Sequence, residues 1–318
     1  MAQRLALIIG NSVYLDGTLS RLLAPDADVG ALGELLLDPE RGGFDDVKVM
    51  VNMSSHIIRR AIASFYAKRT REDLLLLYFS GHGVLDEQGQ LFLAVRDTDS
   101  RLLSGTAIPA TYVTSEMNNS HSQRQVLVLD CCHSGAFARG AKGNVGTSVG
   151  TASIFEGTGY GRVVLTASDA TQYAWEGEQV IGRTENSLFT HYLVEGIQTG
   201  KADIDADGQI TVDELYDYTY EQVVKQTPRQ TPGKWSYKEQ GEIVLARAPS
   251  PNATGSRQVK IPELDGDQEQ RLDQLYNEGL SAFWLEEWDK AVRCLEALVE
   301  MRGEYRDAVN KLELSRRN

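Results

Sequence analysis

Short apolar runs divide the first 245 residues of the chain, and none of them alternates cleanly between apolar and polar positions. Runs of this kind are typical of strands buried on both faces, which occur in parallel sheets covered by helices. The predicted strands are Leu5–Ile9, Val47–Val51, Leu74–Phe79, Val126–Leu129, Val163–Leu165 and Ile243–Leu245. Apolar residues at helical spacing lie between these strands. The alternation predicts an α/β fold, a three-layer α/β/α sandwich with a mostly parallel six-stranded sheet.

The pattern changes after Arg247, where the stretch APSPNATGS is typical of a linker. Beyond it, apolar residues at helical spacing predict a small C-terminal α-helical hairpin unit, which resembles a tetratricopeptide unit. The predicted organisation is a main domain over 1–248, a linker over 249–268 and the helical unit over 269–318. One such unit buries its own apolar face poorly. We therefore expect it to pack on the main domain or, if Trp284 or Trp288 is exposed, to bind a protein partner.

Composition and charge narrow the function classes. The chain has 318 residues, of which 45 are acidic and 32 basic, giving a net charge of −13. This balance argues against a partner such as nucleic acid or an anionic membrane, because both need a basic surface. The longest apolar run, Leu74–Phe79, is far shorter than a membrane span. The three cysteines cannot form a disulfide framework, so we expect a reducing compartment and a cytoplasmic protein.

Two of the predicted strands run directly into residues that carry chemistry. One continues as Ser80–Gly83 (SGHG) and the other as Asp130–Gly135 (DCCHSG). In an open α/β sheet the functional site lies beyond the carboxyl ends of the strands. A thiol and an imidazole that arrive there on neighbouring strands can act as a nucleophile and its base.

These two segments resemble the His-Gly and Asp-x-Cys-His-Ser-Gly motifs of the caspase-like cysteine peptidases. The prokaryotic metacaspase and orthocaspase branch is the most similar. The resemblance covers residues 4–246 and includes the opening strand Leu7–Asn11 and the segment Leu165–Ser168. It implies a caspase-like fold and a cysteine endopeptidase whose chemistry needs no cofactor.

The resemblance also assigns roles to individual residues. His82 matches the catalytic histidine, and Cys132, rather than Cys131, matches the nucleophile because the motif is Asp-x-Cys. The backbone N–H groups of Gly83 and Cys132 match the oxyanion hole. Without the resemblance, a cysteine at a strand end is often an inert small apolar residue, and we keep that interpretation for Cys131.

The substrate pocket is implied in the same way. Asp130 matches an acid at its floor, and a second acid before the first helix falls at Asp28, with Asp26 as a close rival. Ser168, at the end of the matched Leu165–Ser168 segment, is also assigned to substrate binding. The chain lacks the Gln-Ala-Cys-Arg-Gly signature of caspases that cut after aspartate. The acids therefore predict peptide substrates with arginine or lysine before the scissile bond, the P1 position. Alternatively, Asp28 only stabilises the first turn of a helix.

A long glycine-rich segment, Gly135–Gly161, follows the predicted nucleophile. Such a length is unusual for a connection in a compact domain. Because caspase-like zymogens are commonly cut in this interval, we predict activation by cleavage in the 136–160 loop, at Arg139 or Lys142. The alternative is an insertion that is not cut.

A second signal matches the twelve-residue calcium loop, in which oxygen ligands converge on one centre. The candidate ligands are Asp203, Asp205, Asp207, Gln209 and Glu214. The competing explanation is purely structural, since Thr211 and Glu214 are also spaced as a helix capping box. Calcium is thus a possible cofactor outside the reaction itself.

The alternative to an enzyme is a catalytically silent caspase-like scaffold that binds calcium or a partner. Loss of peptidase activity in Cys132→Ala, with folding retained, would discriminate the two.

Overall fold

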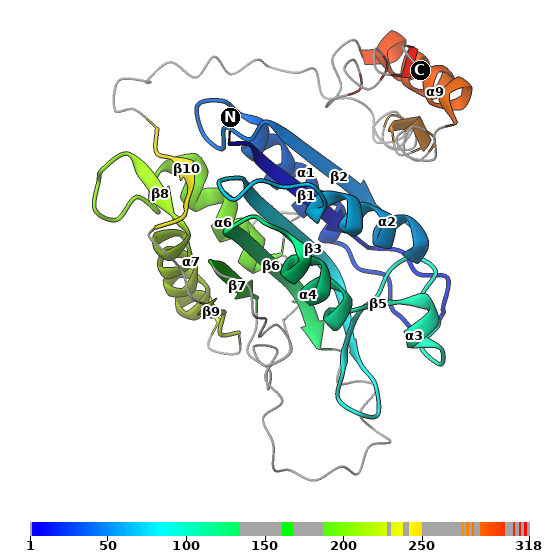
Figure 1. Cartoon of the computed structure of the whole chain (residues 1–318), viewed down its shortest axis with the longest axis horizontal. Helices are drawn as coiled ribbons and strands as arrows, with labels where there is room; N and C mark the ends of the chain where they lie inside the picture. Colours follow the sequence, from blue (N-terminus) through cyan, green and yellow to red (C-terminus); the bar gives the residue numbers. More distant parts are fainter. Residues whose placement is uncertain are drawn as a thin grey trace. The chain divides into compact units, whose positions relative to one another are not determined.

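Five of the six predicted apolar runs form strands of a mostly parallel sheet in the computed structural model (Figure 1). The main strands lie side by side in the order β2-β1-β3-β6-β7-β9. Their bounds are Arg4–Gly10 (β1), Asp46–Val51 (β2), Leu74–Leu85 (β3), Arg124–His133 (β6), Arg162–Thr166 (β7) and Gly233–Tyr237 (β9). Neighbours on this path pair in parallel except β7 with β9. Two short strands, β4 (Leu91–Leu93) and β5 (Ile108–Pro109), add an antiparallel extension beside the end of β3.

The structure describes only part of the chain. The described residues are 2–133, 161–167, 187–227, 230–237, 242–249, 272, 275–276, 278–279, 282, 287–302, 308, 312 and 315–316. The side chains of Cys132 and His133 lie outside this description, although their backbone is included in β6. The chain divides into two units, Met1–Asn252 and Ala253–Asn318, which are described separately here.

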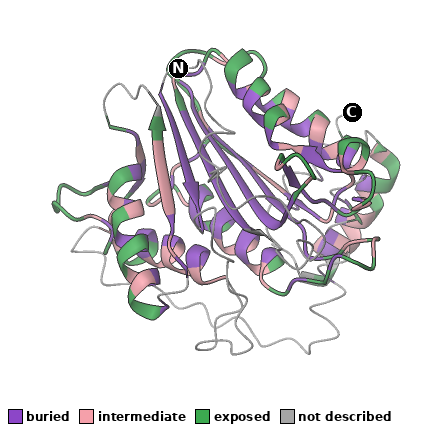
Figure 2. Cartoon of the chain, turned by 90° about the horizontal axis from the view of Figure 1, so that it is seen from below, coloured by how far each residue is buried: buried purple, intermediate pink, exposed green. Residues whose placement is uncertain are grey.

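Helices cover both faces of the sheet, and each face has its own apolar core. One core joins the strands to α1 (Pro25–Leu37), α6 (Leu188–Thr199) and α7 (Val212–Gln226). The other joins them to α2 (Ser55–Tyr66) and α4 (Ala110–Asn119). A single turn, α3 (Leu103–Thr106), precedes β5. Figure 2 shows the buried strands between these helices, so the predicted three-layer α/β/α sandwich is confirmed.

Local signals explain where the helices beside the site begin and end. Pro25 opens α1 at a position where a missing N–H costs little. Ser187 caps α6 by accepting a hydrogen bond from the Thr190 N–H. Gly200 ends α6 with φ of 76°, a conformation that favours glycine. The predicted capping box of Thr211 and Glu214 is present at the start of α7.

The prediction for the last strand of the sheet was wrong. Its sixth place is taken by β9, whereas the run Ile243–Leu245 leads into β10 (Val244–Arg247). That strand pairs antiparallel with β8 (Gln209–Thr211) in a separate two-stranded sheet. The Arg4 guanidinium holds it there by donating to the carbonyls of Val244 and Leu245, at 3.1 and 2.7 Å. The pattern missed β9 because this edge strand, GKWSY, has no run of apolar residues.

The C-terminal unit contains α9 (Trp288–Arg302) and a small core of its own. Within its described residues this core comprises Leu272, Tyr276, Leu295, Leu298, Ala308 and Leu312. Trp288 is partly buried against Ala282 and Ala291, which favours core packing over partner binding for this side chain. Trp284 and all of the predicted linker 249–268 except its first residue lie outside the described residues. Among the helices that are described, none is long and apolar enough to cross a membrane.

Candidate active site

The pairing of β3 with β6 brings the two motif segments together. The parallel register places Ser80 opposite Asp130 and His82 opposite Cys132. Both strands continue through the motifs rather than ending before them. β3 and β6 stay paired as far as Gly83 and His133, and β4 pairs with the last residues of β3. The predicted nucleophile and base thus occupy adjacent backbone positions on neighbouring strands.

His82 is buried, with 6% of its surface exposed. The hydrogen-bond partner of one ring nitrogen determines which of the two nitrogens carries the proton. Nε2 lies 2.9 Å from the Ser20 carbonyl oxygen and 3.4 Å from the Ser20 hydroxyl. Because a carbonyl only accepts, Nε2 carries the proton in the neutral ring and Nδ1 carries the lone pair. Nδ1 is buried and has no hydrogen-bond partner within the described residues. The ring is therefore set to accept a proton through Nδ1.

The environment keeps this histidine neutral. Burial lowers the pKa of His82, and the hydrogen bond to the Ser20 carbonyl only partly opposes that effect. A neutral imidazole at neutral pH is the form that a general base requires.

Two carboxyl groups lie on the same side of the sheet and are also buried. Asp28, on α1, is fully buried, and Asp130, on β6, is 7% exposed. Ser187 at the start of α6 contacts both, since its N–H donates to Asp28 at 2.9 Å and its hydroxyl donates to Asp130. Ser80 donates to Asp28 at 3.2 Å and Thr190 donates to Asp130 at 2.6 Å. Four elements, α1, β3, β6 and α6, therefore converge on one acidic pair.

Within the part of the chain that the structure describes, no positive charge compensates the pair. Burial raises the pKa of Asp28 well above its usual range, and the neighbouring Asp130 carboxyl raises it further. Burial also raises the pKa of Asp130, against the hydrogen bonds from Ser187 and Thr190. Among the described residues no lysine or arginine forms an ion pair with either group. Two like charges at this depth oppose each other's ionisation.

Other predicted site residues fall in different places. Asp26 is exposed on the first turn of α1, in contrast to buried Asp28. Gly83 lies in β3 between Leu93 and His133. Cys131 is buried in the apolar core on the α2 and α4 face, as expected for a structural cysteine. Ser168, Arg139 and Lys142 lie outside the described residues.

The predicted calcium loop brings three of its acids together. One carboxylate oxygen from each of Asp203, Asp205 and Glu214 lies within 4.8 Å of the others. Gly208, at the sixth position, adopts φ of 86°, and its N–H donates to Asp203 at 3.0 Å. Both Asp207 and Gln209 are exposed. Calcium loops usually pair through their short strand, and here β8 pairs with β10 instead.

Sequence reasoning missed several residues that contact the site. Tyr78 and Ser80 precede His82 at intervals of two, so all three face one side of β3. This polar alternation inside an apolar run was a readable signal. Tyr14, Ser20 and Ser187 carried no such signal, because their contacts join segments far apart in the sequence.

The fold, with the two motif segments at the ends of β3 and β6, is that of a caspase-type peptidase domain. Comparison with known protein families leads to the same class. A family model described as the caspase domain matches residues 3–244, so the chain belongs to the caspase domain family of cysteine peptidases. A search of curated proteins found no match.

Solved structures share the fold at low identity. A protein of Geobacter sulfurreducens matches with a TM-score of 0.53 and 15% identity, over 76% of this chain and 99% of that one. Caspase-1 from Spodoptera frugiperda matches with a TM-score of 0.53 and 15% identity, over 78% of this chain and 92% of that one.

Proposed function

We propose that the chain is a cysteine endopeptidase that hydrolyses peptide bonds after arginine or lysine through a Cys132–His82 dyad. The observation that carries the proposal is the buried acidic pair, Asp28 and Asp130. It lies beside positions 82 and 132, which are opposite each other in the pairing of β3 with β6. Burying two acids without a cation is unfavourable for stability. A guanidinium or ammonium from the substrate would provide the missing charge.

The proposed reaction begins with transfer of the Cys132 thiol proton to His82 Nδ1. The sulfur attacks the carbonyl carbon of the scissile bond, and the carbonyl π electrons move to oxygen. The C–N bond then breaks as His82 returns the proton to the leaving amine, which leaves a thioester. His82 next takes a proton from water, and the hydroxide attacks the thioester carbonyl. The C–S bond then breaks as His82 returns its proton to the sulfur, which releases the acid and restores the thiol.

The oxyanion of both tetrahedral intermediates is assigned to the backbone N–H groups of Gly83 and Cys132. One such donor is typically worth about 10²–10³ in rate. Ser168 remains a prediction for substrate binding. The alternative to this enzyme is the silent caspase-like scaffold.

A fluorogenic peptide panel that varies only P1 tests the proposal. We expect hydrolysis after arginine and lysine, about 10²-fold or more above aspartate at P1, because a buried acid pair favours a cation and disfavours an anion. Cys132→Ala is the control for a contaminating peptidase. Preference for aspartate would contradict the pocket assignment, and a folded wild type that cleaves no peptide would support the scaffold.

We further propose that Asp203–Glu214 binds calcium as a regulatory or structural ion. The clustered carboxylates of Asp203, Asp205 and Glu214 support this assignment, because hard oxygen donors are the ligands calcium prefers. The Glu214 side chain reaches back to the start of the loop, where its Oε1 accepts from the Ile204 N–H at 3.0 Å. Asp207 and Gln209 would complete the set.

Isothermal titration with calcium tests this site directly. We expect Asp203→Ala to weaken binding at least about tenfold, because it removes a charged ligand at the first position. Asp217→Asn, an exposed acid on α7 outside the loop, is the matched control and should bind as wild type. Equal heats for wild type and Asp203→Ala would remove the loop as the calcium site.

Two further parts of the proposal concern the 136–160 loop and the helical unit. Cleavage at Arg139 or Lys142 would activate a zymogen, and both residues suit the chain's own predicted P1 preference. A protein partner for the helical unit remains a prediction.

A further inference from the structure

The loop between β1 and α1 forms the cover of His82. The Tyr14 ring lies 5.0 Å from the His82 ring, centroid to centroid, at an interplanar angle of 36°. The Tyr14 hydroxyl accepts from the His82 N–H at 3.0 Å and donates to the Asn11 carbonyl at 2.8 Å. The same loop supplies the Ser20 carbonyl to Nε2. The histidine's backbone, ring face and tautomer all depend on where this loop lies.

Few apolar side chains of this loop are buried, so apolar packing contributes little to its conformation. From Val13 to Arg21 only Leu19 is buried, against Val84 and Ala94. Its conformation must therefore rest largely on polar contacts.

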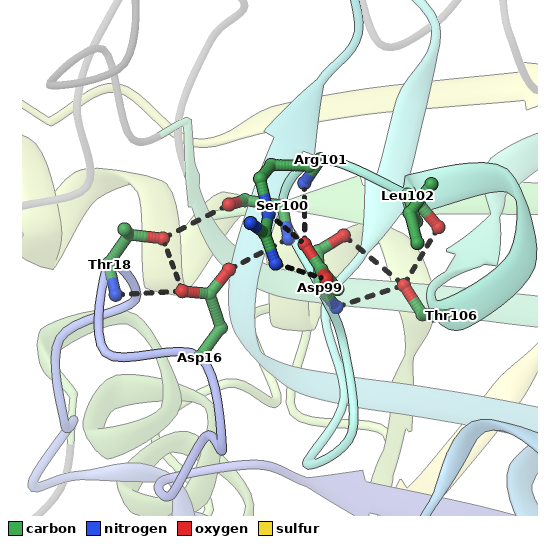
Figure 3. Close-up of polar contacts among 7 residues, drawn as sticks. All are labelled: Asp16, Thr18, Asp99, Ser100, Arg101, Leu102 and Thr106. Carbon is green, nitrogen blue, oxygen red and sulfur yellow. Dashed lines mark hydrogen bonds and ion pairs between the residues drawn. The ribbon is translucent and has the colours of Figure 1, made fainter.

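Those contacts centre on Asp16, as Figure 3 shows. The Asp16 carboxylate accepts from the Thr18 N–H at 2.9 Å, from the Thr18 hydroxyl at 2.7 Å and from the Ser100 N–H at 2.8 Å. The Thr18 and Ser100 hydroxyls lie 3.1 Å apart. The Leu15 N–H adds a bond to the Arg96 carbonyl at 2.9 Å. Asp16 thus joins the loop over His82 to the segment that follows β4.

We propose that Asp16 is a positioning residue for His82, acting by fastening the Tyr14–Ser20 loop to Ser100. The inference rests on the proposed function, because it takes His82 as the catalytic base. Hydrogen bonds from Ser100 and Thr18 lower the pKa of Asp16, so the carboxylate is ionised throughout the pH range of an assay. The charged groups beside it are Asp99 and Arg101. These two form an ion pair with each other, so Asp16 keeps its contacts with Thr18 and Ser100.

The structure provides a matched control within the same cluster. Asp99 accepts from the Arg101 N–H at 2.9 Å and pairs with the Arg101 guanidinium at 2.9 Å. Its backbone N–H and carbonyl bond to the Thr106 hydroxyl (Figure 3). These contacts stay within one segment and do not reach the loop over His82. Removing Asp99 removes a similar carboxylate without releasing that loop.

The test measures the pKa of His82 by NMR titration of its ring protons, in the Cys132→Ala background. Comparison with His82→Gln identifies its signal among the five histidines. In Asp16→Ala we expect the loop to loosen and water to reach the ring. Because burial is the larger influence on His82, its pKa should rise toward the ordinary value of about 6.5. Asp99→Ala should leave the titration unchanged, and Asp16→Asn, which keeps an acceptor oxygen, should shift it less.

Kinetics provide the second readout. With Cys132 restored, Asp16→Ala should lower kcat about 10-fold with little change in KM, and move the acid limb of kcat/KM to higher pH. An unchanged His82 pKa in Asp16→Ala, or an equal shift in Asp99→Ala, would overturn the inference. The titration needs no turnover. A wild type without peptidase activity whose His82 pKa still responds to Asp16→Ala would defeat the proposed function and leave the fastening role intact.

Discussion

Cys132→Ala is expected to reduce kcat/KM for an arginyl peptide at least about 10³-fold, to the level of the background, because no other nucleophile replaces the thiol. His82→Ala should reduce it about 10²–10⁴-fold, the usual contribution of a general base and acid. The double variant should be no worse than Cys132→Ala, since residues that act as a unit are not additive. Each variant is assayed at the same protein concentration by mass, and its thermal unfolding is measured. These two controls separate an effect on folding from an effect on the chemistry.

The adjacent cysteine provides the matched control. Cys131 is buried in the apolar core on the opposite face, so Cys131→Ala removes a sulfur atom one residue away without touching the proposed dyad. We expect it to retain activity and to lose some stability from the cavity it leaves. An inactive Cys131→Ala beside an active Cys132→Ala would exchange the two roles and refute the motif assignment.

The pH profile of the same reaction has a defined direction. Burial lowers the pKa of His82, so the neutral base persists to lower pH than an ordinary histidine. The acid limb of kcat/KM attributable to His82 should therefore lie below about 6.5, the reference value. A limb at or above that value would contradict a buried His82 as the base in the free enzyme.

Most of the fold could be predicted from the sequence, because a strand buried on both faces has an uninterrupted run of apolar residues. β1, β3 and β6 each contain an uninterrupted apolar run, and chemistry-bearing residues at the ends of β3 and β6 mark the functional edge. The edge strand β9 has two aromatic residues, Trp235 and Tyr237, with a serine between them, and no run to detect. Ile243–Leu245 had the run but serves a different sheet, because a run specifies burial and not a pairing partner.

The strand pattern could predict only those site residues that follow strands, and Asp28, on α1, was predicted from the family resemblance instead. Positions 82 and 132 become neighbours once two parallel strands are aligned, and the polar alternation of Tyr78, Ser80 and His82 was readable in β3. Ser187 meets Asp28 across 159 residues of chain, and Ser20 meets His82 across 62. Such contacts depend on how a helix start and a loop are packed in three dimensions, and no local pattern encodes them.

Asp130→Asn and Asp28→Asn are expected to remove the preference for basic P1 residues. Truncating one partner of a buried charge interaction costs about 2–5 kcal/mol, so kcat/KM for an arginyl peptide should fall roughly 30- to 5,000-fold. A citrulline peptide keeps the shape of arginine without its charge and should be much less affected. Asp26→Asn replaces the exposed acid on the same helix turn and should retain arginine cleavage. Loss of arginine cleavage in Asp26→Asn alone would move the pocket to the rival acid.

The same pair predicts how recognition and stability vary with pH. In the wild type the pKa of each acid is raised by burial, so the pair loses protons and gains affinity for a cation as pH rises. The ratio of arginine to citrulline cleavage should therefore increase with pH, and Asp28→Asn should flatten that increase. A raised pKa also means that the folded state loses stability as pH rises through it. The melting temperature of Asp28→Asn relative to wild type should consequently be more favourable at pH 8 than at pH 5, since the substitution removes an acid that resists ionisation. A difference in melting temperature that does not vary with pH would show that the pKa of Asp28 is not raised in the folded protein.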